Sequence, residues 1–185
     1  MTRSRRRSRR GVAWLAVIAA VGLLLAALAF APLGPRDGTP ASDGGLVGQP
    51  APALAASGLD GRMHALADGL GRLTWVNFWA TSCEPCRTEM PAMQRLSDAY
   101  GDRLLILGVD WGESEASVRD FAERYGVTYP ILLDPTLDNF YRWSSLDGLP
   151  RHYFVDAKGI LVRQVIGPLD PTAMAVLMAE LIGPA

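Results

Sequence analysis

The chain contains two cysteines, Cys83 and Cys86, and they are separated by only two residues in the stretch Thr-Ser-Cys-Glu-Pro-Cys. Thiols at this spacing can form a disulfide and can exchange electrons with the disulfide of another protein. A purely structural disulfide is the alternative, but closing so short a loop removes little chain entropy and stabilises a fold only slightly. The pair therefore predicts thiol-disulfide exchange.

The position of the pair predicts which cysteine attacks. The apolar run 73–80 is typical of a strand, and a helix is expected from Glu84 to Tyr100. A thiol at a helix N-terminus has a lowered pKa, because unpaired N–H groups and the helix dipole stabilise its thiolate. Cys83 is thus the expected nucleophile that forms a mixed disulfide with a client. Cys86, expected to be more buried, then attacks the Cys83 sulfur and releases the reduced product.

Three neighbouring residues bear on this reaction. Pro85 lies early in the expected helix, where its missing N–H costs nothing. Glu84 lies beside the nucleophile, where its charge either opposes the thiolate or simply favours the helix start. We expect both residues to contact the client. Glu89 follows Cys86 by three residues, so on a helix it lies close enough to accept the proton of that thiol, with a solvated surface glutamate as the alternative.

The elements expected around the pair alternate between strands and helices. They are a hairpin of 51–55 and 63–66, strand 73–80, helix 84–100, strand 104–110, helix 114–125, strand 129–133, short helix 137–143, a hairpin of 153–156 and 160–166, and helix 170–182. Pro91 should kink the first long helix, and Gly126 should end the second. This order predicts one α/β domain over residues 50–185, with a mixed sheet and helices on both faces.

Composition and charge narrow the possible partners. The 49% hydrophobic and 20% charged residues are ordinary values for a globular domain. Six arginines fall within residues 3–10, whereas every Asp and Glu lies at position 37 or later, so the rest of the chain has a net charge of about −7. Binding to nucleic acid needs clustered Lys and Arg, so an acidic domain argues against it.

The basic tail, residues 1–11, precedes a run that is long enough to cross a membrane. Residues 12–31 carry no charge and no proline, and a helix of 20 residues spans about 30 Å. Arginines stay on the cytoplasmic side, so the run predicts a single membrane anchor with everything after it outside the cytoplasm. Residues 32–49 are rich in Pro, Gly and Ser and predict a flexible linker. Cleavage after Ala29-Phe30-Ala31, which would secrete the domain, is the alternative.

The stretch Trp-Val-Asn-Phe-Trp-Ala-Thr-Ser-Cys-Glu-Pro-Cys-Arg-Thr-Glu-Met-Pro, residues 75–91, resembles the membrane-anchored thiol-disulfide oxidoreductases of the TlpA/ResA type. The element order resembles the thioredoxin fold over residues 50–183. The resemblance implies that Glu89 is an active-site residue and that Glu113 lies near the substrate groove, where a surface role is the alternative. It also implies a cis-proline at Pro150, opposite the cysteines, with the backbone of Leu149 pairing with an incoming peptide.

The same resemblance implies the partners of the reaction. Clients would be protein disulfides, for example in apocytochrome c or in a metal-site protein, and electrons would come from a thiol relay in the membrane. We expect a monomer that needs no cofactor.

The chain departs from the family pattern beside the cysteines and after the proline. Ser82 stands where the family usually has Trp, and Arg151-His152 stand where it usually has Thr-Thr, so client preference stays open. Asn77 occupies the strand position at which thioredoxin carries a buried acid. Its neutrality leaves Glu89 as the nearest candidate carboxylate.

A copper-binding module that uses Cys83, Cys86 and His152 is the alternative function. The only other histidine is His64, and metal sites of this type usually need a fuller ligand set. We therefore expect no metal and interpret His152 as a structural or surface histidine.

Overall fold

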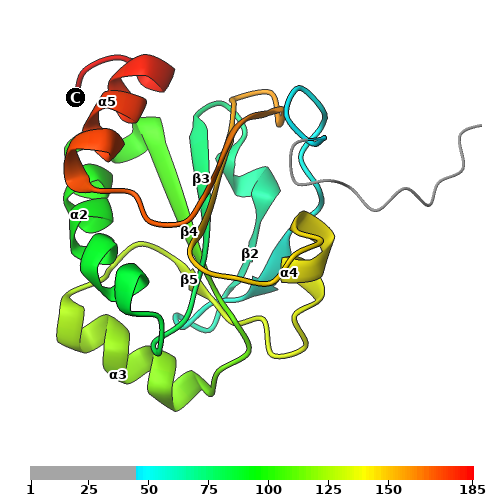
Figure 1. Ribbon diagram of the computed structural model, residues 1–185, viewed down its shortest axis with the longest axis vertical. Helices are drawn as coiled ribbons and strands as arrows, with labels where there is room; N and C mark the ends of the chain where they lie inside the picture. Colours follow the sequence, from blue (N-terminus) through cyan, green and yellow to red (C-terminus); the bar gives the residue numbers. More distant parts are fainter. Residues whose placement is uncertain (1–44) are drawn as a thin grey trace, which may run out of the picture. The chain divides into compact units, whose positions relative to one another are not determined.

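The structure, a computed structural model, describes residues 45–185. The expected basic tail, membrane anchor and most of the expected linker lie outside the described residues. Within residues 45–185, no helix combines the length and apolar character needed to cross a membrane. These residues form an α/β domain around a five-stranded sheet, with a separate two-stranded hairpin (Figure 1).

The central sheet is mixed, as expected. Its strands are β3 (Leu73–Trp79), β4 (Leu104–Asp110), β5 (Ile131–Leu132), β6 (Arg151–Val155) and β7 (Leu161–Ile166). They lie in the order β5-β4-β3-β6-β7, so the strand that precedes the cysteines is the central one. β4 runs parallel to β3 and to β5, whereas β6 is antiparallel to both β3 and β7. β5 is shorter than the expected strand 129–133.

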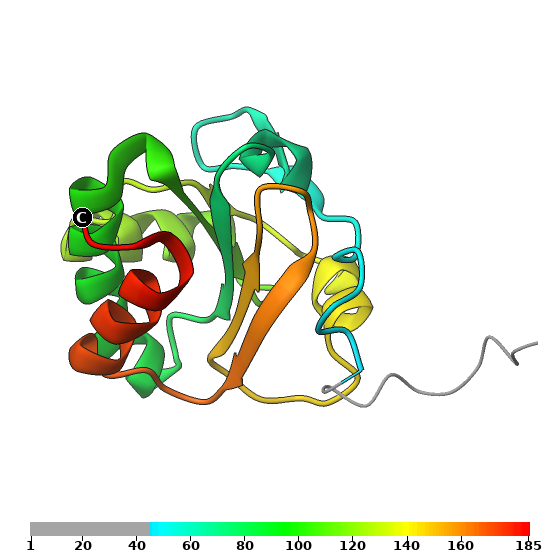
Figure 2. The ribbon, with the colours of Figure 1, turned by 90° about the horizontal axis from the view of Figure 1, so that it is seen from above.

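Helices and the hairpin cover the two faces of this sheet (Figure 2). One face packs against α2 (Glu84–Tyr100), α3 (Glu115–Tyr125) and α5 (Pro171–Ile182). The other packs against α4 (Asp138–Trp143) and the hairpin of β1 (Ala55–Ser57) and β2 (Met63–Ala65). Short 3-10 helices, η1 (Leu66–Gly69) and η2 (Gly101–Arg103), precede β3 and β4. Both faces are therefore covered, as the element order predicts.

Local signals fix the ends of the long helices. The Ser114 side chain accepts a hydrogen bond from the Ser117 N–H at the start of α3, and Gly126 ends that helix with a φ of 65°. The Asp170 side chain accepts N–H groups from the first turn of α5. Pro91 lies inside α2, which continues to Tyr100.

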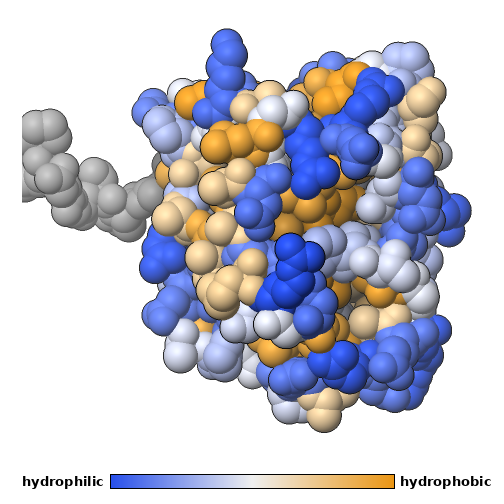
Figure 3. Space-filling model, turned by 180° about the vertical axis from the view of Figure 1, so that it is seen from behind, coloured by the Kyte–Doolittle hydropathy of each residue, from blue (hydrophilic) through white to orange (hydrophobic). Residues whose placement is uncertain are grey.

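The described chain contacts the sheet before the expected boundary at residue 50. Gly48 donates its N–H to the Leu161 carbonyl at 2.8 Å, and Leu161 donates its N–H to the Gln49 carbonyl at 3.0 Å. The last residues of the expected linker therefore lie beside the start of β7. Figure 3 shows hydrophilic and hydrophobic residues interspersed on the face seen from behind, whereas the side chains of both apolar clusters are buried inside.

Candidate redox site

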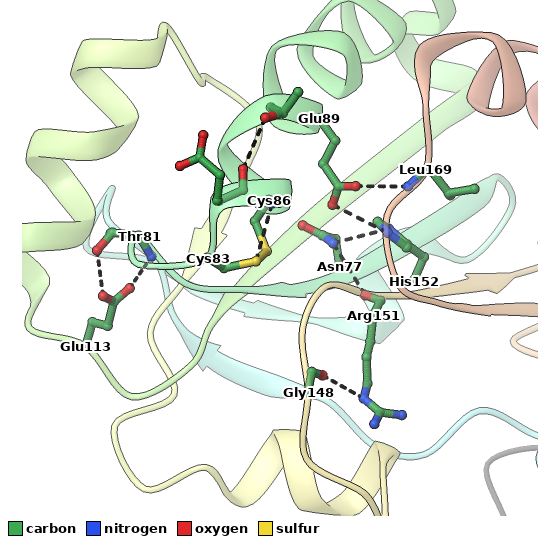
Figure 4. The surroundings of a disulfide bond; sticks show 12 residues. Asn77, Thr81, Cys83, Cys86, Glu89, Glu113, Gly148, Arg151, His152 and Leu169 are labelled. Atoms are coloured by element: carbon green, nitrogen blue, oxygen red, sulfur yellow. Dashed lines mark hydrogen bonds and ion pairs between the residues drawn. A yellow bond between two sulfur atoms is a disulfide. The ribbon is translucent and has the colours of Figure 1, made fainter.

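Cys83 and Cys86 form a disulfide at the N-terminus of α2 (Figure 4). Cys83 is the N-cap residue, and its Sγ accepts the N–H of Cys86 at 3.3 Å. Its side chain is half-buried, whereas Cys86 is completely buried, as expected. A client can therefore reach Cys83 more readily than Cys86. The helix N-terminus that would stabilise a Cys83 thiolate already provides one N–H donor to this sulfur.

Glu84 and Pro85 are exposed in the first turn of α2, next to Cys83. Glu84 forms an ion pair with Arg87, one turn further along the helix. Ser82 is exposed as well, so the departure from the family's Trp falls on the molecular surface. These side chains are placed where a client could meet them.

The loop that carries Cys83 is tied to the loop after β4 (Figure 4). Thr81 donates its N–H to Glu113 Oε2 at 2.5 Å and its hydroxyl to Glu113 Oε1 at 2.6 Å. Glu113 donates its own N–H to Asp110 Oδ2 at 2.8 Å. Burial raises the pKa of Asp110 to about 7, with a further contribution from the charge of Glu113. The carboxylate of Glu113, expected near the substrate groove, thus binds the cysteine loop of its own chain.

The Leu149–Pro150 peptide bond is cis, as expected. β6 starts directly after Pro150, and its first residue, Arg151, lies opposite Phe78 near the end of β3. Because β3 leads into the cysteine loop, the proline and the cysteines lie at the same end of the central strands. Pro150 is buried and Leu149 is half-buried, and Leu149 packs against the apolar cluster that Cys83 also contacts.

Arg151 is buried, with 2% of its surface exposed, although the sequence places it among the residues that bear on client preference. Its Nε–H donates to the Gly148 carbonyl at 2.9 Å, and Nη2 donates to the Asp147 carbonyl at 3.1 Å. Its guanidinium carbon lies 5.9 Å from the centre of the Phe140 ring. The side chain therefore fixes the turn before Pro150 from inside rather than facing a client.

Glu89 is buried, with 3% of its surface exposed, so it is not the solvated surface glutamate considered as the alternative. Its Oε2 accepts the N–H of Leu169 at 3.2 Å, and its Oε1 lies 3.4 Å from Nε2 of His152 (Figure 4). Burial raises the pKa of Glu89 to about 8, against the opposing effect of the Leu169 N–H. The carboxyl group can therefore exchange a proton near neutral pH.

Asn77 and His152 form a polar pair beneath α2. Side chains alternate along β3, and Trp75 and Trp79 pack with Cys86, so Asn77 between them points to the same face. His152 lies opposite Asn77 in the strand pairing and is completely buried. Its Nδ1 lies 3.2 Å from Trp75 Nε1 and 3.2 Å from Asn77 Nδ2. Sequence reasoning missed this role of His152. The available signal was the β6 alternation, which places it on the same face as buried Phe154.

The structure does not bring together the ligands of the alternative copper-binding module. Within residues 45–185, no three His, Cys, Asp or Glu side chains are grouped so that they could hold a metal ion. His152 Nδ1 is occupied by Trp75, and its Nε2 faces Glu89. His64 instead pairs with Asp60 beside the β1–β2 hairpin. The observed arrangement fits proton and thiol chemistry better than metal binding.

Known proteins share this arrangement of elements. A family model described as the AhpC/TSA family matches residues 47–164, which include both cysteines, Glu89 and Pro150. The chain is 37% identical over 131 residues to the thioredoxin-like protein YneN of Bacillus subtilis, covering 69% of this chain and 75% of the relative. It is 37% identical over 124 residues to the thiol-disulfide oxidoreductase ResA of Geobacillus thermodenitrificans, covering 66% and 71%.

Solved structures extend the similarity to three dimensions. The chain is similar to a thiol:disulfide interchange protein of the thioredoxin family from Chlorobium tepidum, with 27% identity and a TM-score of 0.64, over 72% of this chain and 96% of that one. It is also similar to a putative protein disulfide isomerase from Bacteroides thetaiotaomicron, with 29% identity and a TM-score of 0.65, over 72% and 86%.

Proposed function

Since this chain belongs to the AhpC/TSA family and is a thiol-disulfide oxidoreductase of the ResA type, we propose that it reduces protein disulfides outside the cytoplasm while anchored to the membrane. The observation that carries the proposal is the asymmetry of the cysteine pair. Cys83 is partly accessible and caps a helix N-terminus, whereas Cys86 is buried beneath it. One sulfur is thus placed to meet a client and the other to complete the reaction internally.

The reaction starts from the reduced protein. The Cys83 thiolate attacks one sulfur of a client disulfide, a bond forms between Cys83 and that sulfur, and the other client sulfur leaves as a thiolate. Cys86 then loses its proton and attacks Cys83 Sγ. The Cys83–Cys86 bond forms and the second client sulfur leaves as a thiolate, so two electrons have passed to the client. The product is the oxidised state seen in the structure.

Glu89 is the proton acceptor for the second step. It lies one turn after Cys86 on α2 and is buried with it, so it shares the environment in which the thiol must ionise. Its pKa, raised to about 8 by burial, lies close to the ~8.5 of an ordinary thiol, so a proton can pass between the two groups with little driving force in either direction.

The client meets the protein at the end of the central strands that carries the cysteine loop. The half-buried Leu149 offers backbone beside Pro150, where an extended peptide can pair in the manner of a strand. Exposed Glu84 and Pro85 follow Cys83 in the first turn of α2. We expect these four residues to line the path of the client chain.

The cellular setting of the proposal rests on the sequence and on its resemblance to the TlpA/ResA type. Residues 12–31 are apolar and follow an arginine-rich tail, which supports an anchor with the catalytic domain outside the cytoplasm. There the oxidised protein needs a donor, which we propose to be a thiol relay in the membrane. Apocytochrome c or a metal-site protein is the proposed client, and the protein acts as a monomer.

A trapping experiment tests the mechanism. Full-length Cys86→Ser expressed in cells should accumulate mixed disulfides through Cys83, because the resolving thiol is missing. Non-reducing gels should show higher-mass adducts that disappear on reduction, and mass spectrometry of the trapped partners should identify exported proteins with disulfides.

Cys83→Ser is the matched control, since it keeps one thiol but removes the attacking one. Equal adducts in both variants, or none in Cys86→Ser, would show that Cys83 is not the nucleophile. Adducts formed only with cytoplasmic proteins would contradict the proposed location.

A further inference from the structure

We infer that His152 is a positioning residue of this site, which holds its Nε2–H toward Glu89 and thereby sets the pH at which that carboxyl group takes the proton of Cys86. The inference rests on the proposed function, because it concerns the acceptor in the resolving step. It goes beyond that function by assigning a role to a residue that stands two positions after Pro150 and was expected to be structural or on the surface.

His152 is enclosed in the layer between the sheet and α2. It lies on β6 opposite Asn77 of β3, and none of its surface is exposed. Its ring lies 5.7 Å from the centre of the Trp75 ring, in an edge-on arrangement. These neighbours fix both the position and the orientation of the imidazole.

Hydrogen bonding selects one tautomer of this imidazole. Trp75 Nε1 donates to His152 Nδ1 at 3.2 Å, and an indole nitrogen can only donate. Asn77 Nδ2, whose amide also donates to the Arg151 carbonyl at 3.4 Å, lies 3.2 Å from the same Nδ1. Nδ1 must therefore be the acceptor, and the proton of the neutral ring resides on Nε2.

The protonated Nε2 faces Glu89. The distance from Nε2 to Glu89 Oε1 is 3.4 Å, and within the described residues neither atom has a partner with full hydrogen-bond geometry. The Gly167 backbone is the other polar group beside the imidazole, and hydrogen bonding to it favours the charged ring. This buried donor and this buried acceptor are unpaired as they stand, and a small shift of either side chain brings them to ordinary hydrogen-bond geometry. The other carboxylate oxygen accepts the Leu169 N–H, so both oxygens of an ionised Glu89 would have a donor.

This arrangement stabilises the anion of Glu89 against its burial. Removing the Nε2–H would favour the neutral acid, which cannot accept a proton from Cys86. His152 stays neutral meanwhile, because burial lowers its pKa to about 3, with the Gly167 backbone acting in the opposite direction. Of the other groups near Glu89, Cys86 is disulfide-bonded in this state. The pKa of Tyr129 is raised by burial and by the charge of Glu89, so Tyr129 does not titrate in the neutral range.

The tautomer can be measured in the unmodified protein. In the oxidised full-length chain, long-range proton-nitrogen correlation spectra should show His152 protonated at Nε2 only. The imidazole should not titrate between pH 5 and pH 9, because even pH 5 lies about two units above its pKa of about 3. A proton on Nδ1, or a titration near pH 6.5, would overturn the inference without any substitution.

The effect on the reaction is tested with two variants. His152→Phe keeps a ring but has no donor, whereas His152→Gln places an N–H near the position of Nε2. Reduced full-length protein is mixed with Ellman's reagent, which forms a mixed disulfide at Cys83, and the second release of thionitrobenzoate then reports the attack by Cys86. We expect the pH midpoint of this second phase to rise by about one unit in His152→Phe, so the rate at pH 7 falls roughly tenfold. His152→Gln should keep the wild-type midpoint.

The outcomes of this assay distinguish a failure of the role inferred for His152 from a failure of the proposed disulfide-reducing function. If wild-type protein shows no second release at any pH, the proposed function fails. If the release occurs but His152→Phe keeps the wild-type midpoint, or His152→Gln shifts as far as His152→Phe, the role of the Nε2–H is wrong and the function stands. Carbon NMR titration of the Glu89 carboxyl group in the oxidised protein checks the same shift directly, and its spectrum shows whether each variant is folded.

Discussion

The two cysteines differ mainly in how easily a reagent can reach each sulfur. Cys83 is half-buried and accepts an N–H at the start of α2, whereas Cys86 is completely buried. After reduction, a limiting amount of iodoacetamide should modify Cys83 at least roughly tenfold faster than Cys86, since alkylation needs an accessible thiolate. Mass spectrometry of the digested protein measures both rates. In denatured protein the two rates should converge, and similar rates in the folded protein would contradict the assigned roles.

Residue types and spacing were sufficient to predict the cysteine pair and a glutamate, Glu89, beside it, whereas the cis-proline at Pro150 was implied by the family resemblance. The role of His152 depends on Trp75 and Asn77, about 75 positions away, and on Glu89 from a helix above them. Only strand pairing brings these groups together, so a sequence could not show them as one network.

The loops after β3 and β4 act as one unit because of the Glu113 carboxylate. It accepts both the N–H and the hydroxyl of Thr81, two residues before Cys83. In Glu113→Gln one of the two acceptors becomes an NH2 group that faces a donor, so we expect the free energy of unfolding to fall by about 1 kcal/mol. In the same variant, hydrogen exchange of the Thr81 amide should become faster, because its N–H loses an acceptor. Denaturant unfolding and hydrogen-exchange NMR measure the two effects.

Glu115→Gln is the matched control for this loop connection. Glu115 pairs with Arg119 on the exposed side of α3, and surface pairs at this i,i+4 spacing typically contribute about 0.3–0.5 kcal/mol. If the two variants lose the same stability and Thr81 exchange is unchanged in Glu113→Gln, the carboxylate does not hold the cysteine loop.

The long helices were predicted more accurately than the short strands. The bounds of α2 agree with the expectation, and α3 starts one residue later, because Pro85, Ser114 and Gly126 are local signals for helix ends. β5 has two residues, and β1 begins later than expected, because the length of a short strand depends on the partner beside it. The sequence shows the alternation of strands and helices, but it does not show how many residues of each short strand pair with the neighbouring strand.

The domain as a whole takes up protons on folding near neutral pH. Burial raises the pKa of Glu89 from about 4.5 to about 8 and the pKa of Asp110 from about 3.8 to about 7, so the folded state holds two protons that the unfolded chain has lost. Burial lowers the pKa of His152 from about 6.5 to about 3, so below pH 6.5 the unfolded chain holds one proton that the fold excludes. The carboxyl groups favour the fold at low pH, and the histidine opposes them only below pH 6.5.

Stability should therefore fall as the pH rises from about 5 to 8. The folded state holds about one extra proton between pH 5 and 6.5 and about two just below pH 7, and each proton corresponds to roughly 1.4 kcal/mol per pH unit. The decline should end above pH 8, where Glu89 is ionised in both states. Denaturant unfolding of the oxidised full-length protein at several pH values measures this slope of stability against pH.

Glu89→Gln should reduce the slope of stability between pH 6 and 8 by the equivalent of about one proton. Glu180→Gln, at a surface ion pair with Arg163, should leave the slope unchanged. A stability that rises over this interval would show that neither carboxyl group is protonated in the fold.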